Sequence, residues 1–156
     1  MELRSPAFFI GSTLPYQFTC DGDSTSPPLQ WEAPPAGTQS FALILFDSDL
    51  PDEESIFWVL YNLPATCRGL PEAIPNELKV VKGALQGVNS TGAIGYTGIC
   101  PENGTHRYFF KLFALDQSLD LEPGATYAEF KQAIDGHVLD SDELMVRYAR
   151  QVTADL

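Results

Sequence analysis

Basic residues are scarce in this sequence. Nine Lys and Arg stand against 21 Asp and Glu, which gives a formal net charge of −12 and a pI near 4.3. Binding to nucleic acid requires clustered Lys and Arg to neutralise phosphates, and docking on an anionic membrane surface has the same requirement. Because the few basic residues are scattered, the sequence argues against both kinds of partner.

Long apolar runs and paired cysteine motifs are also missing. No run reaches the roughly 18 apolar residues of a membrane span, so we expect no integral membrane segment. The chain does not begin with a basic region followed by an apolar core, so we expect no signal peptide. Cys20, Cys67 and Cys100 have no paired metal-binding spacing, and their odd number leaves at least one unpaired within the chain. We favour free thiols in a reducing cytoplasm.

The sequence does contain short apolar segments separated by turn-forming residues. Its length suggests one domain over residues 1–156, large enough to bury a real core. The near-continuous apolar run at Ser40–Phe46 is typical of a central strand covered on both faces. Four further segments are predicted to be strands: Leu29–Glu32, Ile56–Tyr61, Leu78–Gln86 and His106–Leu115.

The hydrophobic period changes near the C-terminus. Apolar residues from Tyr127 onward recur at helical spacing, and Gly136 is expected to end this helix. Asp140 followed by Glu143 resembles a capping box that opens a second helix, through about Arg150. Strands followed by two helices indicate a mostly β domain with both helices packed at one end, and not alternating βαβ units.

Two aspartates follow the Ser40–Phe46 strand. Asp47 and Asp49 lie two residues apart, so in a regular strand their side chains point to the same face. Two carboxylates on one face repel each other unless a cation or a hydrogen-bond donor lies between them. They could share a proton, hold a water molecule or accept hydrogen bonds from a ligand. The alternative is a polar turn at the strand end with no binding role.

A glycine-rich loop over residues 87–105 leads into the last predicted strand, with His106 at the junction. Histidine changes its charge closest to neutral pH, and nearby carboxylates would favour the protonated form, which binds an anion. Tyr96 offers a phenol donor, and the backbone N–H groups of Gly95–Gly98 are able to form a small anion-binding nest. We predict that four side chains converge on one pocket: Asp47, Asp49, Tyr96 and His106.

Catalytic alternatives use the same residues. Asp47, Asp49 and His106 could bind a divalent metal or act in general acid–base catalysis. Cys100, close to His106 in the sequence, invites a Cys–His nucleophile. Neither an HExxH helix nor a GxSxG elbow is present. We therefore expect a binding protein and not an enzyme, with no catalytic residue, no metal and no cofactor.

Two stretches resemble the phosphatidylethanolamine-binding protein (PEBP) family. The family's DPDAP…HWV…NIP pattern is similar to Asp47–Pro51, followed by Phe57–Val59 and Asn62–Pro64. Its GYxGPCPP…GxHRY pattern is similar to Gly95–Pro101, followed by Gly104–Tyr108. Matches to the bacterial and archaeal, Raf-kinase-inhibitor-like branch cover both ends of the chain: Ser5–Phe8, Thr19–Gly22, Ser26–Leu29, Gly136–Leu139 and Tyr148–Arg150.

The resemblance implies a PEBP-like β-sandwich of antiparallel or mixed sheets, with a pocket for phosphate-like or phosphorylated groups. It implies cis prolines near the motif that ends at Pro51. It also implies a regulatory role, in which the protein inhibits kinases or proteases by occupying such a site. The ligand-binding residues that we carry over are Asp47, Asp49, Phe57, Tyr96, Gly98, Pro101 and His106.

The sequence departs from the family pattern at four positions. Phe57 replaces a second histidine, Ser48 replaces the proline between the aspartates, and Ile99 and Glu102 replace two loop prolines. Losing an imidazole and gaining a carboxylate should weaken anion binding. We predict a small, soluble, cytoplasmic protein that binds an anionic or phosphorylated small ligand and regulates a kinase, a protease or another protein, with a homodimer left open. The alternatives are an enzyme that uses the same pocket, or a protein-interaction module whose pocket is vestigial.

Overall fold

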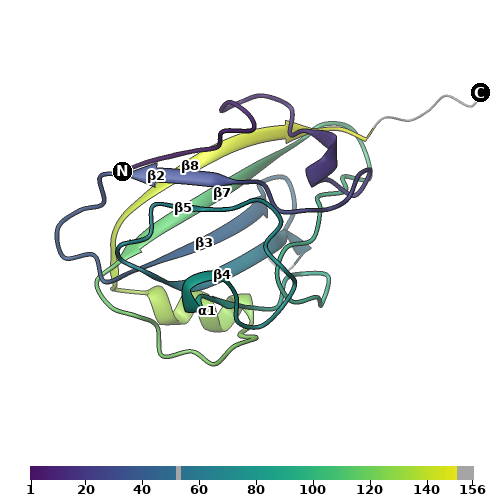
Figure 1. Cartoon of the computed structure of the whole chain (residues 1–156). Helices are drawn as coiled ribbons and strands as arrows, with labels where there is room; N and C mark the ends of the chain where they lie inside the picture. The colour runs from purple at the N-terminus through teal and green to yellow at the C-terminus, as the bar shows by residue number, and fades with distance from the viewer. Residues whose placement is uncertain (52–53, 151–156) are drawn as a thin grey trace, which may run out of the picture.

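Two antiparallel sheets and one α-helix form three layers in the computed structural model, which describes residues 1–51 and 54–150 (Figure 1). The smaller sheet has the order β1-β2-β5, with β1 Glu2–Arg4, β2 Leu29–Glu32 and β5 Gly69–Leu70. The larger sheet has the order β6-β4-β3-β7-β8, with β3 Ser40–Asp47, β4 Ile56–Pro64, β6 Leu85–Gln86, β7 His106–Leu115 and β8 Val138–Tyr148. The predicted mostly β sandwich is confirmed.

The central strand β3 is buried on both faces, as its continuous apolar run predicted. Phe41, Leu43 and Leu45 belong to the core between the two sheets. The alternate residues Ala42 and Ile44 belong to a second core, beneath the helix α1, Tyr127–Ile134. Since one strand contributes to both cores, it fixes the positions of the layers on either side of it.

The second predicted helix is wrong, because Val138–Tyr148 is the strand β8. It lies beside β7 along its whole length, with the register running from His106 opposite Tyr148 to Leu115 opposite Val138 (Figure 1). Leu144, Val146 and Tyr148 are buried and alternate with more exposed residues, which is the period of a strand. The long-range ladder with β7 therefore overrides the local capping-box pattern.

The first predicted helix is confirmed. It begins with a capping box formed by Thr126 and Glu129, and not at the Asp140–Glu143 pattern that the sequence suggested for the second helix. The Thr126 hydroxyl accepts a hydrogen bond from the backbone N–H of Glu129, and the Glu129 carboxylate accepts one from the N–H of Thr126. Gly136 lies two residues after Ile134, the last residue of α1, and has a φ of +81°, which a glycine adopts without a steric cost. Phe130 and Ile134 bury the apolar face of α1 against the sheet.

Other expectations for the middle of the chain are corrected. The predicted strand Leu78–Gln86 is mostly irregular, because Lys82 and Gly83 both have positive φ and the segment Val81–Gly83 forms a 3₁₀ turn; a second 3₁₀ turn lies at Tyr16–Phe18. The Leu50–Pro51 bond is trans, and not cis as the resemblance implied.

Among the described residues, no helix combines the length and the apolar character needed to cross a membrane.

Candidate functional site

The site is built where β3 ends and β7 begins. The antiparallel register places Asp47, the last residue of β3, opposite Tyr108, two residues after the start of β7 at His106. The Nδ1 of His106 lies 2.5 Å from Oδ2 of Asp47. Since the carboxylate accepts, this nitrogen carries the hydrogen. The Asp47 side chain is 1% exposed and that of His106 is 17% exposed, so the pair lies at the inner end of an accessible site.

Asp49 joins the pair from the turn after β3. Its backbone N–H donates to Oδ1 of Asp47 at 2.7 Å. The backbone N–H and the guanidinium of Arg107 each donate to the Asp49 carboxylate at 3.0 Å. These contacts, the backbone N–H first, hold the pKa of Asp49 below its ordinary value. The two aspartates are thus brought together by a turn and not by the strand parity that the sequence suggested.

One cavity of about 430 Å³ opens beside these residues. Its lining consists of Asp47, Asp49, Leu50, Glu54, Phe57, Cys100, Pro101, Glu102, Asn103, His106 and Tyr108. Five of the predicted site residues therefore surround it: Asp47, Asp49, Phe57, Pro101 and His106. Ligand atoms of Asp47, Asp49 and His106 all lie within 4.8 Å of one another.

Another cavity, of about 470 Å³, lies between the segment 88–92 and the start of α1. It is lined mainly by small and polar residues, with Lys131 as its charged side chain: Val88, Asn89, Ser90, Gly92, Thr126, Tyr127, Ala128 and Lys131. Convergent titratable groups are the better mark of a functional site than volume. We therefore take the cavity at His106 as the candidate site.

Tyr96 and Gly98 lie outside this cavity, contrary to the prediction. The ring of Tyr96 packs against Trp58 with centroids 5.4 Å apart, and its hydroxyl donates to the carbonyl of Phe18. Burial raises the pKa of Tyr96 well above its ordinary value. Gly98 packs against the segment around Thr19 of the same chain, since a Cβ at Gly98 would lie 2.7 Å from the carbonyl carbon of Thr19. Both residues attach the loop to the core.

The predicted nest of backbone donors is also wrong at two of its positions. The N–H of Gly95 donates to the carbonyl of Gly87 at 3.2 Å, and the N–H of Thr97 donates to the carbonyl of Phe57 at 3.0 Å. Donors that are already used inside the fold cannot hold an anion. The backbone N–H groups of Gly95 and Thr97 are therefore not available to an anion.

Tyr108 is the functional candidate that sequence reasoning missed. Its side chain is fully buried, and its hydroxyl makes no hydrogen bond of normal geometry with any residue in 1–51 or 54–150. Burial, and after it the negative charge and the nearby oxygen of Asp47, which approaches the phenol without the geometry of a normal hydrogen bond, raise the pKa of the phenol well above its ordinary value. The ring stacks on His106 and meets Phe57 edge to face. The signal was present, because residues i and i+2 of a strand share a face.

Cys100 is joined to Cys20 by a disulfide. The free-thiol prediction is wrong for these two residues, and so is the Cys–His nucleophile. Cys67 is the buried free cysteine, and its thiol donates to the carbonyl of Gly69. The disulfide removes the support that reduced thiols gave to the expected cytoplasmic location, which stays a prediction.

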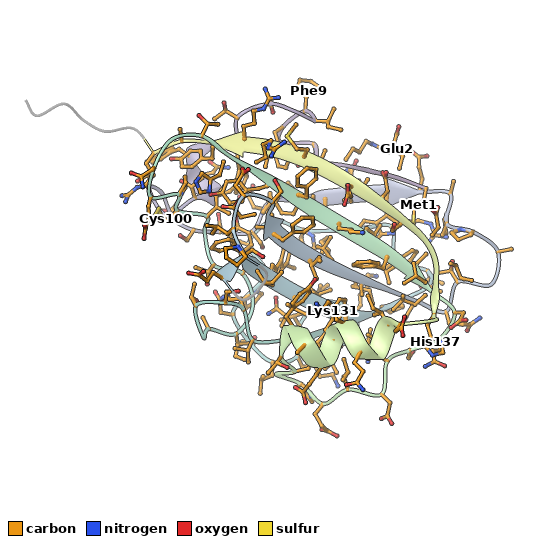
Figure 2. The ribbon with its side chains drawn as sticks, turned by 180° about the vertical axis from the view of Figure 1, so that it is seen from behind. Met1, Glu2, Phe9, Cys100, Lys131 and His137 are labelled. Carbon is orange, nitrogen blue, oxygen red and sulfur yellow. A yellow bond between two sulfur atoms is a disulfide. The ribbon has the colours of Figure 1, made fainter. Side chains whose placement is uncertain are left out.

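The second histidine of the chain lies at the other end of the molecule, where Figure 2 shows His137 well separated from Cys100. Its Nδ1 is 2.9 Å from Oδ1 of Asp116, and its backbone N–H donates to the carbonyl of Ile134, the last residue of α1. These contacts give His137 a structural role at the end of α1. The chain thus contains two His–Asp pairs, of which one lines the cavity.

Comparisons with known proteins agree with this architecture. The sequence model of the phosphatidylethanolamine-binding protein family matches residues 4–149. A UPF0098 protein of Methanothermobacter thermautotrophicus is 43% identical over 150 residues, covering 96% of this chain and 99% of the relative. A UPF0098 protein of Aquifex aeolicus is 41% identical over 153 residues, covering 96% and 89%.

Two solved structures are similar along nearly the whole chain. The crystal structure of a putative PEBP homolog from Chlamydia trachomatis has a TM-score of 0.85 and 35% identity, and the match covers 96% of this chain and 97% of that one. Escherichia coli YbcL, described as a new member of the mammalian PEBP family, has a TM-score of 0.88 and 28% identity, with coverage of 96% and 98%.

Proposed function

This chain belongs to the phosphatidylethanolamine-binding protein family, in its bacterial and archaeal branch, and from that premise we propose that it binds a small anionic or phosphorylated molecule in the cavity at His106. The proposal concerns the ligand class and the residues that hold it. It extends to a regulatory role, in which the occupied site controls a kinase, a protease or another partner.

The Tyr108 hydroxyl carries this proposal. A buried polar group without a partner costs about 1–3 kcal/mol, and folded proteins contain few of them. Tyr108 is one of the residues that line the cavity, and its hydroxyl, near the Asp47 carboxylate, has no hydrogen bond of normal geometry with any described residue. An oxygen acceptor on a ligand would relieve that cost. Phosphate-type groups present several acceptor oxygens, so they match an unpartnered O–H donor better than an amine does.

His106 supplies the second donor in this proposal. Asp47 accepts the hydrogen bond from Nδ1 and fixes the orientation of the ring, so that in the imidazolium form the Nε2–H donates to a ligand. A carboxylate that orients an imidazole in this way is a common second-layer arrangement in binding sites. We propose that a ligand oxygen binds between the His106 ring and the Tyr108 hydroxyl.

We propose binding and not catalysis. The described residues that line the cavity include no serine, threonine or lysine, and the lining cysteine is held in the disulfide. An enzyme that used only Asp47 and His106 for acid–base chemistry is the competing reading. A screen for hydrolysis of phosphate esters by the purified protein, with added divalent metals, tests it. Turnover that His106→Gln abolishes would overturn our choice.

Calorimetric titration with phosphoethanolamine at pH 7, in one buffer with a divalent cation and one with a chelator, tests the binding function. We expect binding in at least one buffer. His106→Gln should weaken it at least tenfold, about 1.4 kcal/mol, because a charge-assisted hydrogen bond is worth more than a neutral one. His137→Gln is the matched control, since it breaks the other His–Asp pair, and it should leave the affinity unchanged. Equal affinity in the His106 variant, or no binding in either buffer, refutes the proposal.

A further inference from the structure

The charge of the cavity does not suit an anion by itself. Four carboxylates line it, from Asp47, Asp49, Glu54 and Glu102, against the imidazole of His106. The whole chain adds to this, with a net charge of −12. An anion entering such a lining is repelled by the four carboxylates, and the imidazole alone does not offset them. A cation inside the cavity would reverse this.

We propose that Asp47, Asp49 and His106 hold a divalent cation, and that the anionic ligand binds to this cation. The second half rests on the proposed function, whereas the cation site stands independently of it. Ligand atoms about 2.1 Å from one ion lie no more than about 4.2 Å apart. Those of the three side chains already lie within 4.8 Å of one another, so small shifts form the site: the more distant atoms move inward, and Nδ1 of His106 and Oδ2 of Asp47, 2.5 Å apart, separate to admit the ion.

Each of the three groups is available to an ion. The backbone N–H of Asp49 donates to Oδ1 of Asp47. This hydrogen bond holds the Asp47 carboxylate in position before an ion binds. Asp49 is paired with Arg107, but its side chain is 34% exposed and that of Arg107 is 56% exposed. An exposed pair of this kind contributes little, so an ion displaces the guanidinium at small cost. The ion replaces the hydrogen between His106 and Asp47.

Tyr108 is the independent observation that indicates a ligand beside this cluster. Tyr108 lines the cavity, and its buried hydroxyl lies near Asp47 and has no normal hydrogen-bond partner among the described residues. A water molecule or a ligand oxygen on the cation would accept that hydrogen bond. Outer groups that orient the species bound to a metal are regular components of such sites.

The donor set indicates the class of ion. Two carboxylates and one imidazole combine the oxygen ligands of Mg²⁺ and Mn²⁺ with the nitrogen ligand of Zn²⁺ and other first-row metals. Mn²⁺ accepts both types and retains free positions for water and for a ligand. We therefore use Mn²⁺ as the probe.

Titration of the metal-free protein with Mn²⁺, followed by calorimetry and by the electron paramagnetic resonance signal of free Mn²⁺, tests the cation site. We expect one ion per chain. Asp49→Asn should weaken binding at least tenfold, and because Asp49 is partly exposed this variant should fold. Arg107→Gln should strengthen binding, since it removes the competing guanidinium and keeps the backbone N–H that positions Asp49. Asp116→Asn, at the other His–Asp pair, should change nothing. Absence of Mn²⁺ binding, or equal binding by Asp49→Asn, overturns the site.

Phosphoethanolamine then tests the bridging role. Its affinity should be at least tenfold higher with saturating Mn²⁺ than with a chelator, and by linkage it should raise the affinity for Mn²⁺ by the same factor. Equal phosphoethanolamine affinity in both buffers overturns the bridge and leaves the proposed function intact. Binding of Mn²⁺ without any binding of phosphoethanolamine supports the cation site and removes the proposed function. The two failures are therefore distinguishable.

Discussion

At the scale of single residues, the Tyr108 hydroxyl has opposite effects on stability and on binding: it lowers the stability of the free protein and favours binding of a ligand. The hydroxyl is buried without a normal partner, so the free protein bears a desolvation cost that an acceptor oxygen on a bound ligand would remove. Residues selected for folding alone would place phenylalanine at such a position. Substituting this hydroxyl therefore distinguishes a binding role from a structural role better than substituting Asp47, Asp49 or His106, because those residues are already paired inside the fold.

We predict that Tyr108→Phe leaves the free energy of unfolding unchanged or raises it by up to about 2 kcal/mol, because the buried donor disappears. The same change should weaken phosphoethanolamine binding about tenfold under whichever condition the wild type binds. Denaturant unfolding and calorimetry measure the two effects.

Tyr61→Phe is the matched control for this substitution. The Tyr61 hydroxyl is equally buried, but it donates to the carbonyl of Glu122 and accepts from the N–H of Ala125. Its removal leaves both backbone groups without this partner, so we expect a loss of about 1–3 kcal/mol of stability and no change in affinity. If the two variants behave alike, Tyr108 has no special role.

Asp21 gives a pH dependence with a defined sign. The Tyr148 hydroxyl and the guanidinium of Arg150 donate to its carboxylate, and the hydroxyl is the larger cause of the lowered Asp21 pKa. A carboxyl whose pKa is depressed by folding adds stability above its unfolded pKa of about 3.9, and this stability is lost as the pH falls through the folded value.

The wild type should therefore lose more stability between pH 5 and pH 2 than Asp21→Asn does. Urea unfolding at each pH measures the difference. Asp23→Asn is the control, because the exposed Asp23 makes no hydrogen bond or ion pair within the part of the chain that the structure describes. Parallel curves for wild type and Asp21→Asn would refute the assignment.

At the scale of elements, a bulge in β4 determines how the large sheet meets the loop before α1. The β3–β4 register shifts between Phe41 opposite Leu63 and Leu43 opposite Leu60, and Asn62 at the bulge has a φ of +59°. The Asn62 amide donates to the carbonyl of Leu119 at 3.0 Å and accepts from its N–H at 2.7 Å. Asparagine suits both the left-handed backbone and the two hydrogen bonds.

Asn62→Ala should lower the free energy of unfolding by about 2–4 kcal/mol, since it loses both hydrogen bonds and adds backbone strain. Asn62→Gly keeps the backbone conformation and should lose about 1 kcal/mol less. Equilibrium unfolding in urea compares them. If glycine is no better than alanine at this position, the positive φ is not a source of strain in the variant.

The elements that the sequence predicted correctly are those whose local pattern and long-range pairing agree. Ser40–Phe46 and His106–Leu115 have apolar runs that suit strands buried in the middle of a sheet, and both were found. In β8 the apolar residues Leu144 and Tyr148 fit a helix as well as a strand. Pairing with β7 decides between the two, and a single local window does not contain that information.

At the scale of the whole molecule, the difference between local sequence pattern and long-range contact explains which site residues were predicted correctly. Asp47 ends β3 and His106 begins β7, and these strands have the strongest apolar runs. Once the two strands pair, Asp47 and His106 therefore lie close together. Tyr96 was placed in the pocket because its hydroxyl was assumed to face the ligand, whereas its partner is the carbonyl of Phe18, 78 residues away. The Cys20–Cys100 bond spans 80 residues. Contacts at these separations depend on the complete fold.

The disulfide fastens the N-terminal segment to the loop that borders the cavity. The same contact is made without it, since the N–H of Cys20 donates to the carbonyl of Ile99 at 3.1 Å and Thr19 pairs with Ile99 as an isolated bridge. Gly98 is packed against the backbone there. The loop is thus positioned by backbone contacts, while the covalent bond restricts the unfolded chain.

The double variant Cys20→Ala/Cys100→Ala should accordingly lose about 3–5 kcal/mol of stability, the amount expected for opening a long loop in the unfolded state. Its affinity for phosphoethanolamine, measured well below the unfolding midpoint, should change by less than about threefold, which corresponds to about 0.6 kcal/mol. A reducing agent should reproduce both effects in the wild type and do nothing further to the variant. A tenfold fall in affinity at full folding would show instead that the bond shapes the cavity, because Cys100 lines it. Reduction would then switch ligand binding, and stability and binding would be coupled through one covalent bond.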